Sequence, residues 1–328
     1  MTIETIQPPL RVLVTGATGF VGAALVRALE SHQGYVPICA VRSGKSLDVP
    51  TAQLFAIADL SPATDWSEGL KDTDLVVHAA ARVHVMKEVA SDALAEFRKV
   101  NVEGTVNLAK QAAVAGVKRF VFISSIKVNG EATDIDRPFT ADDLPAPLDP
   151  YGISKKEAED ALRVISAETG MEVVIIRPTL IYGPGVKANF RSMMGWLKKG
   201  IPLPFGSIHN KRSLVSLENL VSLILVSLRH PGAAGETFLV SDGVDLSTTE
   251  LLERTATALG VKSHLIPVPS QLLIFCAVAL GRRSLSQRLC GSLQVDIKKT
   301  QTLLGWQPPV SIEEALDRTA KEFLEHRV

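Results

Sequence analysis

The segment from Arg11 to Glu30 restricts the fold of this chain more than any other stretch. It consists of an apolar run, Arg-Val-Leu-Val-Thr, then Gly-Ala-Thr-Gly-Phe-Val-Gly at positions 16–22, then an amphipathic stretch. We predict a strand, a tight turn at Gly16 and a helix that ends at about residue 30. Gly19 lets the backbone approach a pyrophosphate, Gly22 lets the helix pack on the strand, and the helix N-terminus offers N–H groups to phosphates. Because a strand precedes the glycines and a helix follows them, the pattern predicts a dinucleotide-binding turn.

The rest of the first half alternates short apolar strands with helical patterns. Such alternation predicts an α/β fold with a doubly wound parallel sheet of the Rossmann type, whose ligands lie beyond the carboxyl ends of the strands. A stretch dense in Pro and Gly, 178–185, interrupts the pattern. We therefore predict a dinucleotide-binding domain over residues 1–180 and a smaller α/β substrate domain over residues 181–328, with segments that return to the first domain. The predicted strands are 35–41, 53–58, 74–78, one from Val121 to the serines at 124–125, and 172–177; the predicted helices are 92–115 and one that starts after Pro150.

Charged residues follow the second and third predicted strands. Arg42 ends the second strand, where NAD sites usually carry an acid that binds the ribose hydroxyls. A guanidinium there can bind a 2′-phosphate, so we predict NADP, with NAD possible and a solvated loop arginine as the alternative. Asp59 can accept a hydrogen bond from the adenine amino group or cap the turn at Ser61, and the sequence leaves both open. We expect His78 and Asn101 to be hydrogen-bonded structural residues.

A serine and a Tyr-Lys pair mark the next strand and helix. Ser125 ends the strand that starts at Val121, and Tyr151 and Lys155 are four residues apart, so they share one helix face. A free tyrosine titrates at about pH 10, and lowering its pKa to about 7 requires about 4 kcal/mol of phenolate stabilisation. The lysine ammonium supplies part of it, and Ser125 can donate to the same substrate oxygen. Tyr-x-x-x-Lys alone is common on helix surfaces; beside a nucleotide site it predicts proton-transfer chemistry.

Composition excludes several classes of protein. The 328 residues include 35 basic and 35 acidic side chains, so their charges cancel. The chain therefore lacks the net positive charge that would indicate a nucleic acid or an anionic membrane as partner. Cys39, Cys276 and Cys290 are scattered without the spacing of metal ligands, which predicts neither a disulfide framework nor a metal site. With no signal-peptide pattern at the N-terminus, these features predict a cytoplasmic protein.

The second half of the chain carries weaker signals. We predict helices at about 247–259 and about 311–326, and a basic turn at 209–213 before a helix that begins near Ser216. The segment from Gln271 to Leu280 is strongly apolar, too short to span a bilayer, and followed by Arg282 and Arg283. We predict a core or lid helix there, with a membrane-surface contact as the alternative.

Together these motifs resemble those of the extended short-chain dehydrogenase/reductases, specifically the NAD(P)-dependent nucleotide-sugar epimerase/dehydratase group. The resemblance covers essentially the whole chain. The string Ser-Ser-Ile-Lys-Val-Asn-Gly at 124–130 is similar to that of bacterial O-antigen proteins described as UDP-hexose epimerases or 4-keto-sugar reductases. The motifs that carry the resemblance are Thr15-Gly-Ala-Thr-Gly-Phe-Val-Gly22, Asp59-Leu60, His78-Ala-Ala80, Asn101-Val-x-Gly-Thr105, Ser124-Ser125, Tyr151-x-x-x-Lys155, Arg177-Pro178, Tyr182-Gly-Pro-Gly185 and Leu304-Gly-Trp-x-Pro308.

The resemblance implies roles for individual residues. It makes Tyr151 the acid/base, Lys155 the residue that holds the nicotinamide ribose and tunes Tyr151, and Ser125 the ligand of the reacting sugar oxygen. The implied substrate-binding residues are Ser125, Lys127 (with a solvated loop lysine as the alternative), Asn189, and Arg212 and Arg288 for the nucleotide diphosphate. The implied cofactor-binding residues are Gly16, Thr18, Gly19, Phe20, Val21, Arg42, Asp59, Leu60, Ala79, Ala80, Tyr151, Lys155 and Pro178.

Departures from the family's motifs narrow the predicted reaction. Sugar 4,6-dehydratases share an Asp-Glu pair after the catalytic hydroxyl, where this chain has Ile126-Lys127. The GDP-fucose synthase type carries a cysteine beside the serine, and this chain has none there. We predict hydride transfer at C4 of a UDP-sugar by a UDP-4-keto-hexose (6-deoxy-HexNAc) reductase of surface-polysaccharide biosynthesis, such as lipopolysaccharide O-antigen. Arg42 favours this reading because a reductase consumes its cofactor, commonly NADPH, whereas an epimerase keeps bound NAD.

Three other functions stay open, and the resemblance also implies an assembly. The main alternative is a UDP-glucose or UDP-N-acetylglucosamine 4-epimerase. A steroid- or flavonoid-type ketone reductase and a non-catalytic NADPH sensor are further alternatives. In related enzymes the helices that correspond to 92–115 and 151–169 pair across a two-fold axis, so we predict a homodimer.

Overall fold

The chain divides into two compact units in a computed structural model that describes residues 8–44, 52–83, 92–279, 281, 287 and 289–325. Unit 1 comprises Met1–Val128, Pro145–Arg177 and Leu223–Phe238. Unit 2 comprises Asn129–Leu144, Pro178–Ser222 and Leu239–Val328. Each unit therefore combines segments that lie far apart in the sequence.

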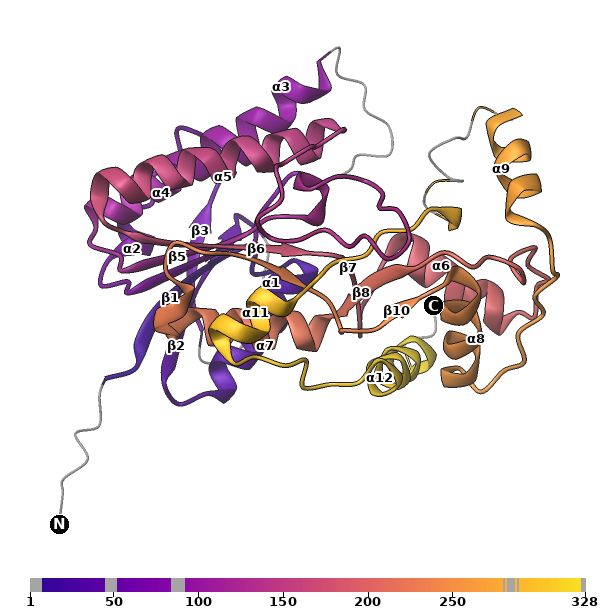
Figure 1. Ribbon diagram of the computed structural model, residues 1–328. Coiled ribbons are helices and arrows are strands. Elements are labelled where there is room, and N and C mark those ends of the chain that lie inside the picture. The colour runs from indigo at the N-terminus through magenta and orange to yellow at the C-terminus, as the bar shows by residue number, and fades with distance from the viewer. Residues whose placement is uncertain are drawn as a thin grey trace. The chain divides into compact units, whose positions relative to one another are not determined.

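A seven-stranded sheet, most of which belongs to unit 1, has the order β3-β2-β1-β4-β5-β6-β9 (Figure 1). Its first six strands pair in parallel, and β1 has β2 on one side and β4 on the other. Strands β1 to β3 are added toward one edge of the sheet and β4 to β6 toward the other, so the strand order switches between β1 and β4, which is where parallel α/β folds bind ligands. The predicted doubly wound parallel sheet is confirmed. The strands are β1 (Leu10–Thr15), β2 (Tyr35–Arg42), β3 (Gln53–Ile57), β4 (Leu75–His78), β5 (Arg119–Ile123), β6 (Glu172–Pro178) and β9 (Thr237–Val240).

Helices cover both faces of this sheet. α4 and α5 lie side by side over one face, and α1 lies on the other (Figure 1). α5 begins after Asp149, whose carboxylate accepts a 2.7 Å hydrogen bond from the Gly152 N–H, with Pro150 at the first helical position. The helices of unit 1 are α1 (Phe20–Ser31), α2 (Ser67–Leu70), α3 (Ala93–Arg98), the π-helical turn η1 (Lys99–Glu103), α4 (Gly104–Val114), the short 3-10 turn η2 (Ile126–Val128) and α5 (Pro150–Thr169).

The long helix predicted over 92–115 is confirmed, because α3, η1 and α4 follow one another without a break over residues 93–114, and the π turn η1 widens it in the middle. Asn101 lies in this π turn and is buried. Its carboxamide accepts from the Arg82 N–H at 2.8 Å and donates to the Arg82 carbonyl and to Ser154 Oγ. π turns occur as single wide turns within helices, frequently at functional sites. Here the turn holds the chain after β4 against α5, and Asn101 is the structural residue that the sequence predicted.

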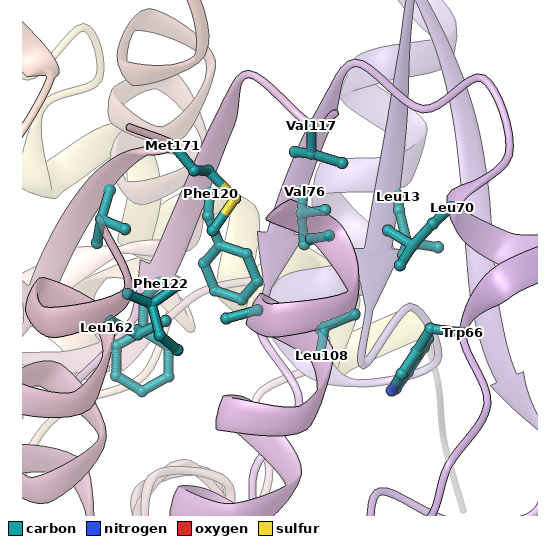
Figure 2. Close-up of a cluster of buried hydrophobic side chains, with 14 of the residues drawn as sticks. Leu13, Trp66, Leu70, Val76, Leu108, Val117, Phe120, Phe122, Leu162 and Met171 are labelled. Atoms are coloured by element: carbon teal, nitrogen blue, oxygen red, sulfur yellow. The ribbon is translucent and has the colours of Figure 1, made fainter. Parts of the chain in front are cut away.

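The hydrophobic core of unit 1 lies between the sheet and the pair α4 and α5 (Figure 2). Alternate residues of the strands point to this face, such as Leu13, Val76 and Phe120. Leu108 from α4 and Leu162 from α5 pack against them and are fully buried. Each such side chain contributes about 1.5–3 kcal/mol through removal from water. This packing fixes the face of α5 that turns toward the sheet.

Unit 2 contains a small sheet with the order β10-β8-β7, in which β7 and β8 are parallel and β8 and β10 antiparallel. The basic turn predicted at 209–213 is wrong in part, because Arg212 and Ser213 begin β8 and pair with β10. α7 (Leu217–Arg229) starts in unit 2 and ends in unit 1. The elements of unit 2 are β7 (Leu180–Tyr182), β8 (Arg212–Ser216), β10 (Asp245–Leu246), α6 (Ala188–Lys198), α8 (Thr248–Ala258), α9 (Ser270–Ala279), α11 (Lys298–Leu304) and α12 (Ile312–Glu325).

The apolar segment predicted as a core or lid helix does form a helix, α9, but it buries none of its side chains. The prediction of a core helix is therefore wrong. Among the described residues, every helix is too short or too polar to cross a bilayer.

Candidate active site

The glycine-rich turn packs tightly against the end of β4. Gly16 has φ +70°, and a Cβ atom there would lie 2.8 Å from the Ala80 nitrogen. A Cβ on Gly22 would lie 2.2 Å from the Gly16 carbonyl oxygen, which confirms the close approach expected of that position. Gly19 is the N-cap of α1 and provides no side-chain cap, so the N–H groups of the first turn are free to receive an anion. This cradle fits a dinucleotide pyrophosphate.

His78 ends β4 and is completely buried in a chain of hydrogen bonds. The Ala80 N–H donates to Thr15 Oγ, and Thr105 Oγ donates to the Asn101 carbonyl. Thr105 therefore accepts from His78 Nε2–H at 2.9 Å, and Thr15 donates to His78 Nδ1 at 2.6 Å. The bonds assign a neutral imidazole. Burial, with the nearby Lys155 charge as a second cause, lowers the pKa of His78 to about 3. His78 is a structural residue, as predicted.

The predicted adenosine-binding residues lie at the carboxyl ends of β2 and β3. Arg42 is the last residue of β2, exposed, and opposite Ile57 in the sheet. Asp59 is also exposed, and its carbonyl accepts from Thr64 Oγ, so the backbone of this turn is held locally. Leu60 lies against Gly104, where a Cβ atom would be 3.0 Å from it. The cofactor roles of these residues stay predictions.

The start of α5 brings two of the three predicted catalytic residues together. Tyr151 is in the first turn of α5, and Ser125 is the second residue after β5. The Ser125 hydroxyl is near enough to the Tyr151 phenol to favour its ionisation, so it lowers the pKa of that phenol. Ser125 Oγ also accepts from the Lys127 N–H at 3.2 Å, which orients the hydroxyl. Both side chains are partly exposed, so a substrate oxygen can approach them.

Lys155 lies one helical turn after Tyr151 on α5 and is buried, with a relative exposure of 2%. Its Nζ donates to the Ile123 carbonyl at 2.9 Å and is 4.4 Å from the centre of the Phe122 ring and 6.0 Å from that of Tyr151. Burial lowers the pKa of Lys155 to about 7, and the Glu159 carboxylate opposes that shift. The ammonium is thus held by the Ile123 carbonyl and the Phe122 ring within 6.0 Å of the centre of the Tyr151 ring.

Burial raises the pKa of Tyr151 above its usual value, and the negative charge of Asp149 acts in the same direction. The hydrogen bond from Ser125 acts in the opposite direction. Ionisation of this phenol therefore depends on positive charge near the ring, which Lys155 contributes. A phenol, a hydroxyl and an ammonium in this order can move a proton at one substrate oxygen and stabilise the charge that results.

A buried ion pair beneath this site was missed by the sequence analysis. Glu159 Oε1 accepts from Arg177 Nε at 2.9 Å and from Ser124 Oγ at 2.6 Å, and Arg177 Nη2 donates to Oε2 at 2.5 Å. Both charged side chains are almost fully buried. Glu159 follows Lys155 by four residues, so it shares the helix face, and Ser124 precedes Ser125. Those spacings are the signals that could have revealed the pair.

The predicted substrate-binding residues lie in different parts of the chain. Lys127 forms an ion pair with Asp149, the N-cap of α5, so the alternative of a solvated loop lysine does not describe it. Asn189 is exposed on α6, and Arg212 begins β8, where its guanidinium donates to the Gly291 carbonyl at 3.0 Å. Arg288 lies outside the described residues. The substrate roles of all four stay predictions.

Three features define the extended short-chain dehydrogenase/reductase class: a parallel α/β sheet, a glycine turn suited to a pyrophosphate, and a serine after a strand beside a Tyr-Lys pair on a helix. Residues 12–241 match the family model described as "NAD dependent epimerase/dehydratase family". The chain belongs to this family, and it is an NAD(P)-dependent enzyme of the epimerase and reductase kind.

Known proteins resemble the chain over nearly its full length. It is 50% identical over 318 residues to a UDP-glucose 4-epimerase of Vibrio cholerae, a match that covers 97% of this chain and 96% of the relative. The structure of MoeE5 in complex with UDP-glucuronic acid and NAD has a TM-score of 0.76 and 25% identity, with 97% of this chain and 100% of that chain covered. RMD from Pseudomonas aeruginosa complexed with NADPH has a TM-score of 0.72 and 24% identity, covers 95% of this chain and 99% of its own, and shares the fold.

Proposed function

We propose that this enzyme transfers hydride at C4 of a UDP-hexose. The observation that carries the proposal is the proximity of Ser125, Tyr151 and Lys155, with the Lys155 ammonium one turn away on α5 and 6.0 Å from the centre of the Tyr151 ring. NAD(P), when bound, accepts or supplies the hydride. The glycine turn would hold its pyrophosphate, and Lys155 its nicotinamide ribose. The UDP-hexose is supported by the 50% identity to a protein named UDP-glucose 4-epimerase.

Three side chains divide the proton chemistry. In the oxidative direction the Tyr151 phenolate accepts the proton of the C4 hydroxyl, and in the reductive direction the phenol returns it. Ser125 donates to the same oxygen and fixes its position. The Lys155 charge favours the phenolate by direct attraction. Asn189 and Arg212 are proposed to bind the sugar and its diphosphate.

We propose 4-epimerisation as the net reaction, because the relative that supports it matches almost the whole chain. Reduction of a 4-keto sugar is the second candidate, and Arg42 at the end of β2 favours it through its capacity to bind a 2′-phosphate. The decisive test is incubation of the purified enzyme with UDP-glucose and no added cofactor. Formation of UDP-galactose at a sustained rate supports the epimerase. Turnover only with a UDP-4-keto-hexose and stoichiometric NADPH consumption establishes the reductase instead.

Arg42→Ala tests the cofactor preference separately. An arginine–phosphate hydrogen bond is worth about 1.5–3 kcal/mol, so loss of the guanidinium weakens NADPH binding about ten- to hundredfold and leaves NADH nearly unchanged if Arg42 binds the 2′-phosphate. Titration of cofactor fluorescence measures both affinities, with Arg27→Ala on the exposed side of α1 as the control. Equal weakening of both cofactors would assign Arg42 to adenine contact alone and remove the support for NADP.

A further inference from the structure

The carboxylate at the start of α5 makes two contacts that the chemistry described above does not use. Asp149 is the N-cap of α5, and its Oδ1 accepts from the Gly152 N–H at 2.7 Å. Its Oδ2 accepts from the ammonium of Lys127, which belongs to η2. Tyr151 is two residues after Asp149, in the first turn of the same helix. One carboxylate thus caps the helix that carries the phenol and binds a lysine from a neighbouring turn.

The backbone around Lys127 holds the same segment against Ser125 and α5. The Lys127 N–H donates to Ser125 Oγ at 3.2 Å. A Cβ atom on Gly152 would lie 2.9 Å from the Lys127 carbonyl oxygen, so η2 and the first turn of α5 are in close contact. The ion pair therefore joins the segment that carries Ser125 to the helical turn that carries Tyr151.

The two charges of this pair act on the Tyr151 phenol in opposite directions. Burial raises the pKa of Tyr151, and the negative charge of Asp149 adds to that effect. A cation beside the carboxylate opposes the second cause, because the two fields partly cancel. The side chains of Lys127 and Asp149 are 31% and 22% exposed, so water screens them only in part. The proton affinity of the phenol therefore depends on how far Lys127 neutralises Asp149.

Other elements also pack near the start of α5. α3 places Phe97 against Tyr151, with the ring centroids 6.1 Å apart, and η1 contacts α5 through the bond from Asn101 to Ser154. The charged side chains of α3 and η1 are bound in ion pairs or exposed: Glu96 pairs with Arg82 and Arg98 with Glu157, and Lys99 and Glu103 are exposed. Among the described residues, Lys155 and the Lys127–Asp149 pair are thus the charges placed to act on the phenol.

We propose that Asp149 and Lys127 are positioning residues that together set the proton affinity of Tyr151. The Asp149 charge favours the protonated phenol, and Lys127 moderates that effect, so that Tyr151 can both accept and return a proton. This inference rests on the proposed function, in which Tyr151 is the acid/base. It assigns Lys127 an effect through Asp149, which requires no contact between the lysine and the substrate.

The pH dependence of turnover tests the proposal. Asp149→Asn removes the charge and retains an N-cap, since asparagine caps helices as well as aspartate does. We expect the acidic limb of the pH profile of kcat/KM, which reports the ionisation of Tyr151, to move down by about one pH unit. Lys127→Met should move the same limb up. Asp160→Asn removes a carboxylate from an exposed ion pair on α5 and, as the matched control, should leave the limb in place.

A double variant shows whether Lys127 acts through Asp149. If it does, Lys127→Met shifts the acidic limb of the wild type but barely shifts that of Asp149→Asn, because the charge that it neutralises is already absent. Equal shifts in both backgrounds would give Lys127 a direct contact with the phenol or the substrate and overturn the proposed pairing. An unmoved limb in Asp149→Asn would overturn the role of the carboxylate.

A spectroscopic titration separates this inference from the proposed function. The chain has three tyrosines, so isotopic labelling of their ring carbons gives few NMR resonances, and Tyr151→Phe identifies the one that belongs to Tyr151. We expect this resonance to titrate at lower pH in Asp149→Asn than in the wild type, with no substrate present. A lower midpoint in an enzyme that turns over no UDP-hexose would support the charge pair and refute the proposed function. Equal midpoints in an active enzyme would overturn the charge pair alone.

Discussion

Two buried polar clusters in unit 1 share one aromatic ring but differ in charge: one is centred on a neutral imidazole and the other on a lysine ammonium. The first contains His78, and the second contains Lys155 and the residues around it on α5. The Phe122 ring stacks on the His78 imidazole, with centroids 5.8 Å apart, and is 4.4 Å from the Lys155 ammonium. His78 stays neutral because burial lowers its pKa, the Lys155 charge adds to that effect, and both ring nitrogens have hydroxyl partners.

The difference between the clusters separates a structural residue from a chemical one. The hydrogen bonds of His78 are complete, so it has no proton to exchange near neutral pH. Among the described residues Lys155 donates to one carbonyl and lies against two aromatic rings, and its pKa of about 7 means that it titrates near neutral pH. Burial acts on both groups, but only the second cluster opens to a partly exposed phenol. Perturbed pKa values therefore indicate function here only when combined with access.

Tyr151→Phe gives the largest effect that this comparison predicts. Loss of the phenolic proton removes general acid/base catalysis, so turnover falls about a thousandfold while the free energy of unfolding changes by less than about 1 kcal/mol. The assay is conversion of the UDP-hexose that the wild type accepts, with urea unfolding in parallel. Tyr35→Phe removes a hydroxyl that contacts Arg229 on the surface and is the control. Retention of wild-type turnover by Tyr151→Phe would contradict the chemical role of the second cluster.

Glu159→Gln distinguishes buried from exposed charge pairs on the same helix. It removes the carboxylate charge that is paired with the buried Arg177 guanidinium, and the free energy of unfolding falls by about 3–5 kcal/mol. Glu157→Gln breaks the exposed pair between α5 and Arg98 of α3. We expect it to lower the free energy of unfolding by less than about 1 kcal/mol. Urea unfolding of both variants measures the contrast. Equal losses would show that the buried pair has no special weight beneath the active site.

The buried His78 predicts a smaller effect on stability, one that depends on pH. The pKa of His78 is lowered from 6.5 to about 3 on folding, so the unfolded chain binds more protons between these values and stability falls as the pH drops through that window. Between pH 7.5 and pH 5 this one group accounts for about 2 kcal/mol. Urea unfolding at both pH values measures it. His78→Gln should lose that part of the slope, and the exposed His264→Gln should keep it; an unchanged slope in His78→Gln would mean that another group causes the acid sensitivity.

The sequence by itself determined the parts of the molecule whose constraints are local. Gly16 and Gly22 are required by backbone geometry, strand and helix periods follow from alternating burial, and Tyr151 and Lys155 share a face through the pitch of α5. The parallel arrangement of the strands also follows, since strands alternate with helical segments along the chain. These features therefore placed the glycine turn and the Ser-Tyr-Lys set correctly along the chain.

Only the tertiary structure decided how distant residues complete one another. The Glu159–Arg177 pair joins α5 to β6, Asn101 joins a π turn to the backbone of Arg82, and Lys127 pairs with Asp149. Charge and hydrogen-bond partners depend on distance in space, which sequence separation does not reveal. The same holds for α9, because an apolar run is compatible with a core helix or a surface helix, and the neighbours that would bury it are specified only by the packing of the whole unit.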